Sequence, residues 1–201
     1  MSPKPMARPG GRSARVQASV HAAVRELEAE QGRAALTVPL VAARAGVTPS
    51  TIYRRWGDLQ ELLSDVAVER LRPDTEPADH GDLRADLTAW AEQFLDEMSS
   101  TAGRAYIRDA LLGDPDGGNA GQCSDYAAAQ VDLVLDRARE RGKNGAGGEG
   151  DADGGGGASA REAVMDHVVA PIMYRILFRP EGLSAAYARE LVERTLDRLP
   201  G

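Results

Sequence analysis

Apolar residues recur every three or four positions along most of the chain, which is the spacing of one face of an α-helix. In the first third this pattern predicts helices over residues 14–31, 38–45, 49–56 and 59–72. Ser13, Thr37, Thr48 and Asp58 stand immediately before these helices and are residues that cap helix N-termini well. Gly46 follows the second helix, at the position where a glycine commonly ends a helix.

The rest of the sequence has the same helical periodicity. It predicts helices over residues 83–98, 106–111, 127–138, 160–178 and 184–199. No segment alternates apolar and polar residues for long enough to predict a strand, so we predict an all-α fold. Residues 142–157 contain nine glycines in sixteen positions and are predicted to form a mobile loop, because they cannot bury enough apolar surface to offset their entropy.

These patterns divide the chain into three parts. Residues 1–12 are rich in proline, glycine and arginine without periodicity, which predicts a flexible basic arm. Residues 13–72 predict a head of three helices followed by a connecting helix. Prolines and polar residues over 73–81 then break the pattern, so residues 73–201 are predicted to form a separate helical bundle.

Composition narrows the class of protein. Of the 201 residues, 42% are hydrophobic and 27% are charged, as in globular proteins. The chain has no apolar run of about 18 residues and no apolar core of a secretory signal near its start, so we expect a cytoplasmic protein without a membrane partner. A single cysteine, Cys123, excludes an internal disulfide and a cysteine-based zinc site. The three histidines are scattered, and we expect neither a metal nor a cofactor.

Charge is distributed unevenly along the chain. Residues 1–58 carry nine basic and four acidic side chains, a net charge of +5. The remaining residues have a net charge of −12. A basic N-terminal part on an acidic body favours a module that binds a polyanion.

The basic part contains a motif over residues 37–56, which read TVPLVAARAGVTPSTIYRRW. A helix-turn-helix needs a small residue in its first helix, a glycine at the turn and an apolar residue pointing inward from its second helix. Ala42, Gly46 and Ile52 have these properties at the required spacing. The second helix then presents side chains that suit phosphate oxygens and base edges in a major groove: Ser50, Thr51, Tyr53, Arg54 and Arg55. The alternative is a helical hairpin in another kind of bundle, with both arginines merely solvated.

The stretch AARAGVTPSTIYRRW, followed by GDLQELL, resembles the signature of the tetracycline-repressor (TetR/AcrR) family over residues 13–66. The resemblance implies a homodimeric bacterial regulator with an N-terminal DNA-binding head and a helical domain that dimerises and often binds a small effector. It places phosphate contacts on Thr37, Thr48 and Tyr53, and base contacts on the exposed face from Pro49 to Arg55. One position departs from the pattern, because Leu59 stands where many members have a lysine. That phosphate contact is lost, and we expect arginines of the basic arm to compensate.

The C-terminal half resembles one TetR subgroup through RARERG and VAPIMYRIL. Its last two helices are apolar over more than one face, which predicts that a partner subunit covers one of them. We expect the interface to include Val168, Ile172, Ile176, Leu191 and Leu196. A wholly intramolecular core is the alternative, and periodicity alone does not decide which face meets the partner.

Aromatic and sulfur-containing side chains of the C-terminal helices are candidates for an effector pocket: Trp90, Phe94, Met98, Tyr106, Tyr126, His167, Met173 and Tyr174. We therefore predict a regulator of transcription, not an enzyme, that represses by binding an inverted-repeat DNA operator and is released by a small apolar or amphipathic effector. Two alternatives remain open: activation of transcription, or a helical interaction module whose DNA binding is weak or lost.

Overall fold

The computed structural model describes residues 11–114, 117–146 and 160–198, with side chains described only to residue 142 in the second range. The predicted arm over residues 1–12 lies outside this part except for its last two residues. The predicted glycine-rich loop lies outside it from residue 147 onward.

The described residues form helices joined by short turns and contain no strand, which confirms the all-α prediction. The head consists of α1 (Arg12–Gln31), the short helix η1 (Arg33–Ala35), α2 (Val38–Ala45) and α3 (Pro49–Trp56). The connecting helix is α4 (Leu59–Leu71). The body consists of α5 (Leu83–Ser99), α6 (Thr101–Leu112), α7 (Gly118–Ala146), α9 (Ala170–Phe178) and α10 (Ala185–Leu196). Residues 160–164 and a π-helical segment, η2 (Met165–Val169), lead directly into α9.

Side-chain caps begin α2 and α4, whereas α1 and α3 begin without one, although Thr48 stands at the N-cap position of α3. The Thr37 side chain accepts a hydrogen bond from the amide of Leu40 at 3.3 Å, and Asp58 Oδ1 accepts one from the amide of Glu61 at 2.8 Å. Gly46 ends α2 with a φ of +68°, a conformation that a residue with a Cβ rarely adopts.

Several boundaries differ from the sequence-based expectation, and two helices begin well before it: α6 begins at Thr101 rather than at residue 106, and α7 begins at Gly118 rather than at residue 127. Helix α1 begins at Arg12, so Ser13 lies inside the helix and does not cap it. Helix α7 continues through Gly142 to Ala146, although we expected it to end at that glycine. A single glycine costs a helix about 1 kcal/mol, and a helix of 29 residues is long enough to tolerate it.

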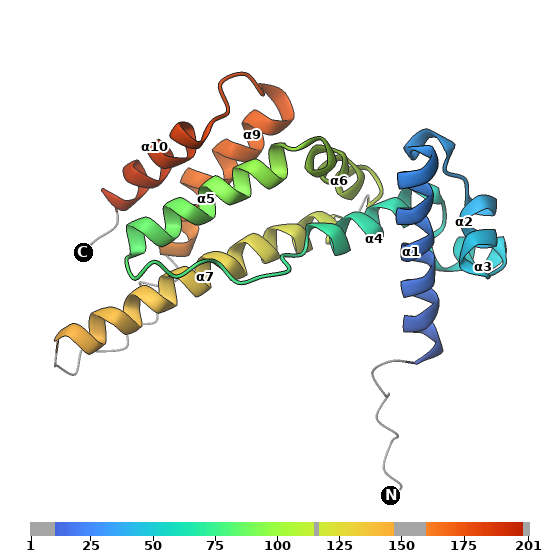
Figure 1. Ribbon diagram of the computed structural model, residues 1–201, viewed down its shortest axis with the longest axis horizontal. Helices are drawn as coiled ribbons and strands as arrows, with labels where there is room; N and C mark the ends of the chain where they lie inside the picture. Colours follow the sequence, from blue (N-terminus) through green and yellow to red (C-terminus); the bar gives the residue numbers. More distant parts are fainter. Residues whose placement is uncertain (1–10, 115–116, 147–159, 199–201) are drawn as a thin grey trace, which may run out of the picture.

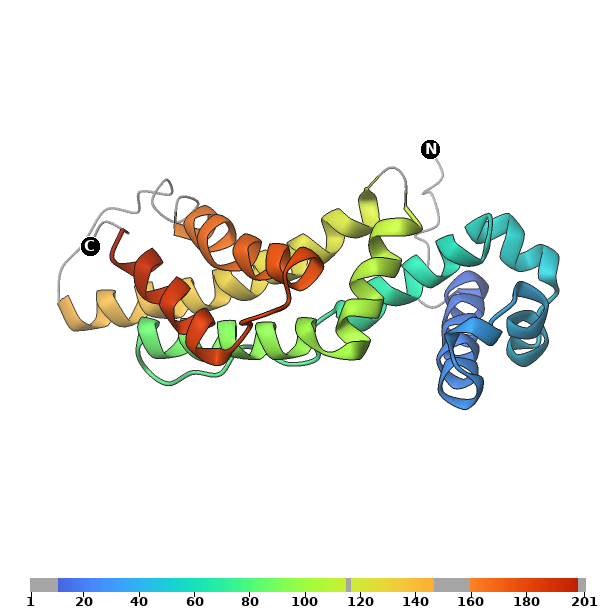
Figure 2. The same ribbon diagram turned by 90° about the horizontal axis from the view of Figure 1, so that it is seen from above.

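The molecule has two hydrophobic cores at opposite ends of α4. One core joins α1, α2 and α3 to the first turns of α4 through Leu62, Leu63 and Val66. The other lies among α5, α6, α7, η2, α9 and α10, and Leu71 at the end of α4 packs against it. Figure 1 shows the head and the elongated body with α4 running between them, and Figure 2 shows α6 crossing α4.

Helix α4 is held to the body by contacts near its middle. The buried hydroxyl of Ser64 donates a hydrogen bond to the carbonyl oxygen of Ala110 at 3.2 Å and accepts one from the side-chain Nδ2 of Asn119 at 2.8 Å. A Cβ at Gly113 would lie 2.2 Å from the carbonyl oxygen of Gln60, so only glycine permits this approach of α6 to α4.

Candidate nucleic-acid interface and ligand cavity

Helices α2 and α3 form a compact helix-turn-helix. Ala42 and Ile52, which the motif places inside, are fully buried. Gly46 makes the turn between the helices, and Val41 is buried beside Ala42. The second helix of the motif is therefore fixed by its inner face, and its other faces remain available for binding.

The outer face of α3 is polar and basic. Pro49, Ser50 and Arg54 are exposed, and half of the Tyr53 surface is accessible. Thr48 is exposed before α3, and its hydroxyl is hydrogen-bonded to the hydroxyls of Ser50 (2.9 Å) and Thr51 (3.0 Å). Arg54 has no ion-pair partner among the described residues, so its guanidinium is available for a phosphate or a base edge. Thr37 is also exposed, although its side chain already caps α2.

Arg55 is placed differently from Arg54. Its guanidinium donates hydrogen bonds to the carbonyl oxygen and hydroxyl of Ser13, at 3.0 and 2.7 Å, and to Gln17 Oε1 at 2.6 Å. It also lies over the ring of Trp56, 5.0 Å from the centroid. Arg55 thus fixes the C-terminal end of α3 to the start of α1, a role that the sequence motif did not indicate.

A buried histidine joins α1 to α4 within the head. His21 is 2% exposed, and its Nε2 lies 2.9 Å from Asp65 Oδ2 while its Nδ1 contacts Glu69. Burial lowers the pKa of His21, but hydrogen bonds and charges from both carboxylates raise it by more. The pKa of the imidazole therefore lies above its ordinary value. Asp65 also accepts hydrogen bonds from the indole of Trp56 at 2.7 Å and from Gln17 at 3.0 Å. One carboxylate therefore connects α1, the end of α3 and α4.

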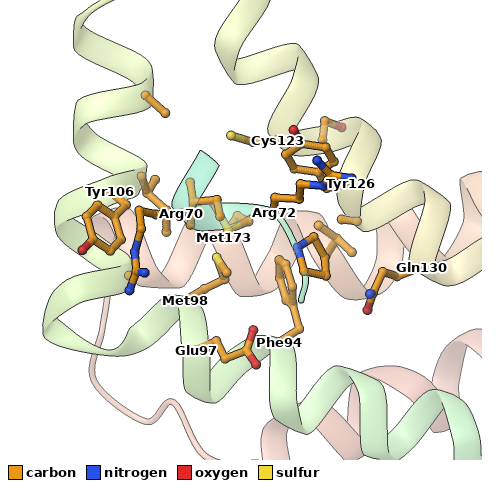
Figure 3. Close-up of a pocket in the computed structure, with 18 of the residues that line it drawn as sticks. Arg70, Arg72, Phe94, Glu97, Met98, Tyr106, Cys123, Tyr126, Gln130 and Met173 are labelled. Atoms are coloured by element: carbon orange, nitrogen blue, oxygen red, sulfur yellow. The ribbon is translucent and has the colours of Figure 1, made fainter. Parts of the chain in front are cut away.

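The body contains a cavity of about 640 Å³, large enough for a drug-sized molecule. Its wall comes from the end of α4 and the linker after it, and from α5, α6, α7 and α9. Figure 3 shows Phe94, Met98 and Met173 around its centre, with Tyr106 and Tyr126 at opposite ends. Six of the eight residues proposed from the sequence line it: Trp90, Phe94, Met98, Tyr106, Tyr126 and Met173.

The other two proposed pocket residues lie elsewhere. His167 is exposed on η2, and Tyr174 is 55% exposed and packs against Phe178. His167 and Tyr174 lie one or two positions from residues that line the cavity. Successive side chains of a helix point in directions about 100° apart, so near neighbours can lie on different faces. Helical periodicity does not show which face points into the cavity, and it could not distinguish these two residues from Met173.

Several cavity residues were not identified from the sequence. Arg70 and Arg72 come from the end of α4 and the residue after it, and Arg70 lies over the ring of Tyr106 at 5.7 Å. Gln130 accepts a hydrogen bond from the indole of Trp90 at 3.2 Å and donates one to the Thr75 carbonyl oxygen at 2.8 Å. Cys123 also lines the cavity, and burial raises the pKa of its thiol, so the thiol stays protonated. No local sequence signal marks these residues, because they meet only after the linker folds against α5 and α7.

The residues proposed for the dimer interface face the interior of the single chain. Val168, Ile172 and Ile176 are at most 3% exposed, and Leu191 is 7% exposed. Leu196 is half-buried against the same core. They fill the space between α9, α10 and the rest of the body, as the alternative of an intramolecular core expects, and their contact with a partner stays a prediction. The exposed apolar side chains of α9 are instead Tyr174, Leu177 and Phe178.

The described residues contain no group of three or more His, Cys, Asp or Glu side chains placed to hold a metal ion. None of their helices combines the length and hydropathy needed to cross a membrane.

Known proteins resemble both parts of the chain. The family model described as bacterial regulatory proteins, tetR family, matches residues 20–66, and the one described as tetracyclin repressor-like, C-terminal domain, matches residues 77–195. An uncharacterized HTH-type transcriptional regulator of Mycobacterium tuberculosis is 32% identical over 120 residues, which cover 57% of this chain and 58% of that protein. The alignment therefore spans less than two thirds of that relative. A second such regulator, YdeS of Bacillus subtilis, is 24% identical over 87% of this chain and 84% of its own.

Solved structures show the same fold. A crystallised TetR family transcription regulator superposes with a TM-score of 0.61 and 28% identity, over 92% of this chain and 99% of its own. A TetR transcriptional regulator from Agrobacterium tumefaciens superposes with a TM-score of 0.56 and 20% identity, over 90% of this chain and 92% of its own.

Proposed function

The chain belongs to the TetR family of bacterial helix-turn-helix transcriptional regulators, and we propose that it is a repressor that leaves its operator when a small molecule enters the cavity. In this proposal two chains form a homodimer, and α3 of each chain reads one half of an inverted repeat. The observation that carries the DNA-binding step is the outer face of α3, where exposed Tyr53 and Arg54 stand beside the hydroxyls of Ser50 and Thr51.

The contacts inside the head support this role for α3. Ile52 and Trp56 anchor its inner face, and Arg55 ties its last turn to α1. A reading helix held at several points loses little further freedom when it enters a major groove. Hydroxyl, phenol and guanidinium groups then meet phosphates and base edges, while the acidic body stays away from the DNA.

Dimerisation is supported by the family and by the outer face of α9. Tyr174 and Phe178 expose 55 and 70% of their surfaces on that helix, and their ring centroids lie 5.4 Å apart. Such a pair of large apolar side chains favours burial against a second copy. A two-fold dimer presents two reading helices about one DNA turn apart, which matches an inverted repeat.

Replacing Tyr53 or Arg54 by alanine is expected to weaken operator binding by about 1–3 kcal/mol each, because each change removes a phosphate or base contact. Operator sequences are first selected from random DNA with the unaltered protein. Fluorescence anisotropy then measures the operator affinity at several salt concentrations. The loss of one phosphate contact should reduce the slope of log affinity against log salt concentration by about one.

Arg84→Ala is the matched control for Arg54→Ala, since Arg84 is a half-exposed arginine of α5, far from α3, that pairs with Glu193. It should leave operator affinity unchanged. If both head variants bind as tightly as the unaltered protein, α3 does not read the DNA through these side chains. A stable dimer that selects no DNA would favour the interaction-module alternative, and activation of a reporter gene would favour the activator.

The cavity supports release by an effector with an apolar or amphipathic structure. Its centre is lined by aromatic, aliphatic and sulfur-containing side chains, and charged side chains such as Arg70 and Arg72 come from the end of α4. A ligand there would touch the helix that carries the head. Differential binding of 1–3 kcal/mol between two conformations lowers operator affinity about 5- to 150-fold.

Filling the cavity from α7 is expected to block ligand binding. Ala127 is 8% exposed and lines the cavity, so the Ala127→Phe side chain would occupy part of its volume. The probe is 1-anilinonaphthalene-8-sulfonate, an amphipathic dye whose fluorescence rises in apolar sites, and its affinity should fall about tenfold or more. Ala129→Phe makes the same change at an exposed position of α7 outside the cavity and should leave dye binding unaltered. Equal dye binding by both variants would place the dye elsewhere.

A further inference from the structure

The head and the body are joined by a second connection besides α4. Arg33, in η1 of the head, contacts Asp109 on α6 through two guanidinium nitrogens: Nε donates to Oδ2 at 3.2 Å, and Nη2 donates to Oδ1. Gln60 at the start of α4 donates to Oδ1 of the same carboxylate at 3.4 Å. We call Arg33, Gln60 and Asp109 the clasp.

Asp109 is unusual for a charged residue, because its side chain is only 5% exposed. A carboxylate removed from water is strongly unfavourable unless charged or hydrogen-bonding partners compensate it. Arg33 supplies a planar pair of donors that matches the two carboxylate oxygens. The position of Arg33 is therefore tied to that of Asp109, although 76 residues separate them.

The Arg33–Asp109 pair of the clasp joins η1 to α6, and neither of these two residues belongs to α4. Among the hydrogen bonds of the described residues, the Arg33–Asp109 pair alone joins residues 11–58 to residues beyond 73. A single connecting helix lets the head turn about the helix axis or bend with it. A second attachment off that axis removes this freedom and fixes the angle between the reading helix and the body.

The same helix that carries Asp109 also forms a wall of the cavity. Tyr106, Ile107 and Ala110 of α6 line the cavity, while Asp109 points to the head. Both ends of α6 pack closely against other helices: a Cβ at Gly103 would lie 2.1 Å from the carbonyl oxygen of Glu97, and one at Gly113 would lie 2.2 Å from that of Gln60. Because Asp109 lies between Ile107 and Ala110 in the sequence, a ligand that displaces this part of α6 also moves Asp109.

We propose that Arg33 and Asp109 are positioning residues for operator binding, and that cavity occupation changes the placement of the head through the clasp as well as through α4. This inference rests on the proposed function, since it assigns the coupling between the two sites. Neither residue belongs to the outer face of α3 or to the cavity wall. Their pairing fixes the head at the angle that operator binding needs.

The test measures the head-to-body distance directly in the full chain. Spin labels are attached at Ala43→Cys on α2 and Ala129→Cys on α7, both exposed, in a Cys123→Ser background. Labelled chains are mixed with an excess of unlabelled chains, so that electron–electron resonance reports the distance within one chain. Arg33→Gln and Asp109→Asn should each broaden the distance distribution, and the double variant should broaden it no further.

Arg44→Gln is the matched control, because Arg44 is similarly exposed and its ion pairs with Glu26 and Glu30 stay within the head. It should leave the distribution narrow. Operator affinity should fall about tenfold in Arg33→Gln, in Asp109→Asn and in the double variant alike, because coupled residues are not additive. Arg33→Lys should lose less affinity than Arg33→Gln, because lysine keeps the positive charge. A helical circular dichroism spectrum equal to that of the unaltered protein separates these effects from unfolding.

A narrow distribution in the Arg33→Gln protein, or equal broadening in the Arg44→Gln protein, would overturn the proposal. So would additive effects of the two clasp substitutions. The distance measurement needs no DNA, so its outcome stands apart from the proposed function, which fails if the unaltered protein selects no operator. If Asp109→Asn prevents folding, Arg33→Gln decides the question alone.

Discussion

Replacing Ile172 by aspartate is expected to unfold the body of the protein rather than separate a dimer. Ile172 is fully buried between η2, α10 and the rest of the body core. Truncating such a side chain to alanine costs about 2–5 kcal/mol, and an unpaired buried carboxylate costs several kcal/mol more. Because domains are stable by only about 5–15 kcal/mol, most of the folded population of the body should be lost. Circular dichroism and thermal unfolding measure this loss.

Phe178→Asp is the matched control on the same helix. Phe178 is 70% exposed, so a carboxylate there remains hydrated and the helical content should stay unchanged. If the outer face of α9 is the dimer surface, sedimentation should show a monomer for Phe178→Asp and a dimer for the unaltered chain. A folded monomer from Ile172→Asp would instead place the inner face of α9 in the interface.

Replacing Asp65 by alanine should destabilise the head by about 2–3 kcal/mol, because hydrogen bonds to a charged group contribute about 1.5–3 kcal/mol. The substitution removes the acceptor for the indole of Trp56 and one of the two carboxylates that contact buried His21. The 30% exposure of Asp65 keeps the figure below that of a fully buried ion pair. Asp65→Asn retains an acceptor oxygen and should show a smaller loss. Equal stability of all three proteins would mean that water replaces the carboxylate without cost.

The same cluster makes the stability of the head depend on pH. The folded-state pKa of His21 lies above its ordinary value of 6.5, so its contribution is complete below pH 6.5 and is lost as pH rises through the folded-state pKa. Burial raises the pKa values of Asp65 and Glu69, but the hydrogen bonds from His21 together with the other hydrogen bonds and positive charges around them lower these pKa values by more. The contribution of the two carboxylates is therefore complete above pH 4.5 and is lost as pH falls through their folded-state pKa values.

The head should therefore be most stable between pH 4.5 and 6.5. Denaturant titrations at a series of pH values give the free energy of unfolding, followed by the fluorescence of Trp56 in a Trp90→Phe background. His21→Gln should remove the loss of stability above pH 6.5 and leave other pH dependences in place. If the free energy of unfolding of His21→Gln falls above pH 6.5 as steeply as that of the unaltered head, a group other than His21 causes the fall.

Local sequence signals account for most of the helices and for the helix-turn-helix. Thr37, Gly46 and Asp58 act within one helical turn, and the structure has them at the helix ends where the pattern predicts them. Ala42 and Ile52 could be assigned to the interior because two helices joined by a short turn can pack in few ways. Ser13 failed as a cap because a helix can begin two residues earlier without any side-chain cap.

Tertiary structure decided which of two apolar faces of α9 points inward. Val168, Ile172 and Ile176 repeat at helical spacing, and so do Tyr174 and Phe178, so periodicity predicts both stripes equally well. Only the positions of α5 and α10 select the first stripe for the core of the single chain. For the same reason six of the proposed cavity residues line the cavity, whereas His167 and Tyr174 do not.

The sequence by itself thus determined the helices, the turn of the motif and the polar outer face of α3, because these depend on residues within about four positions of one another. Tertiary structure alone decided the partners of His21, the anchoring role of Arg55 and the pairing of Arg33 with Asp109. These contacts join residues 38–76 positions apart, and each charged side chain has many possible partners along the chain. Which partner it meets depends on how whole helices pack, and a local pattern carries no information about that packing.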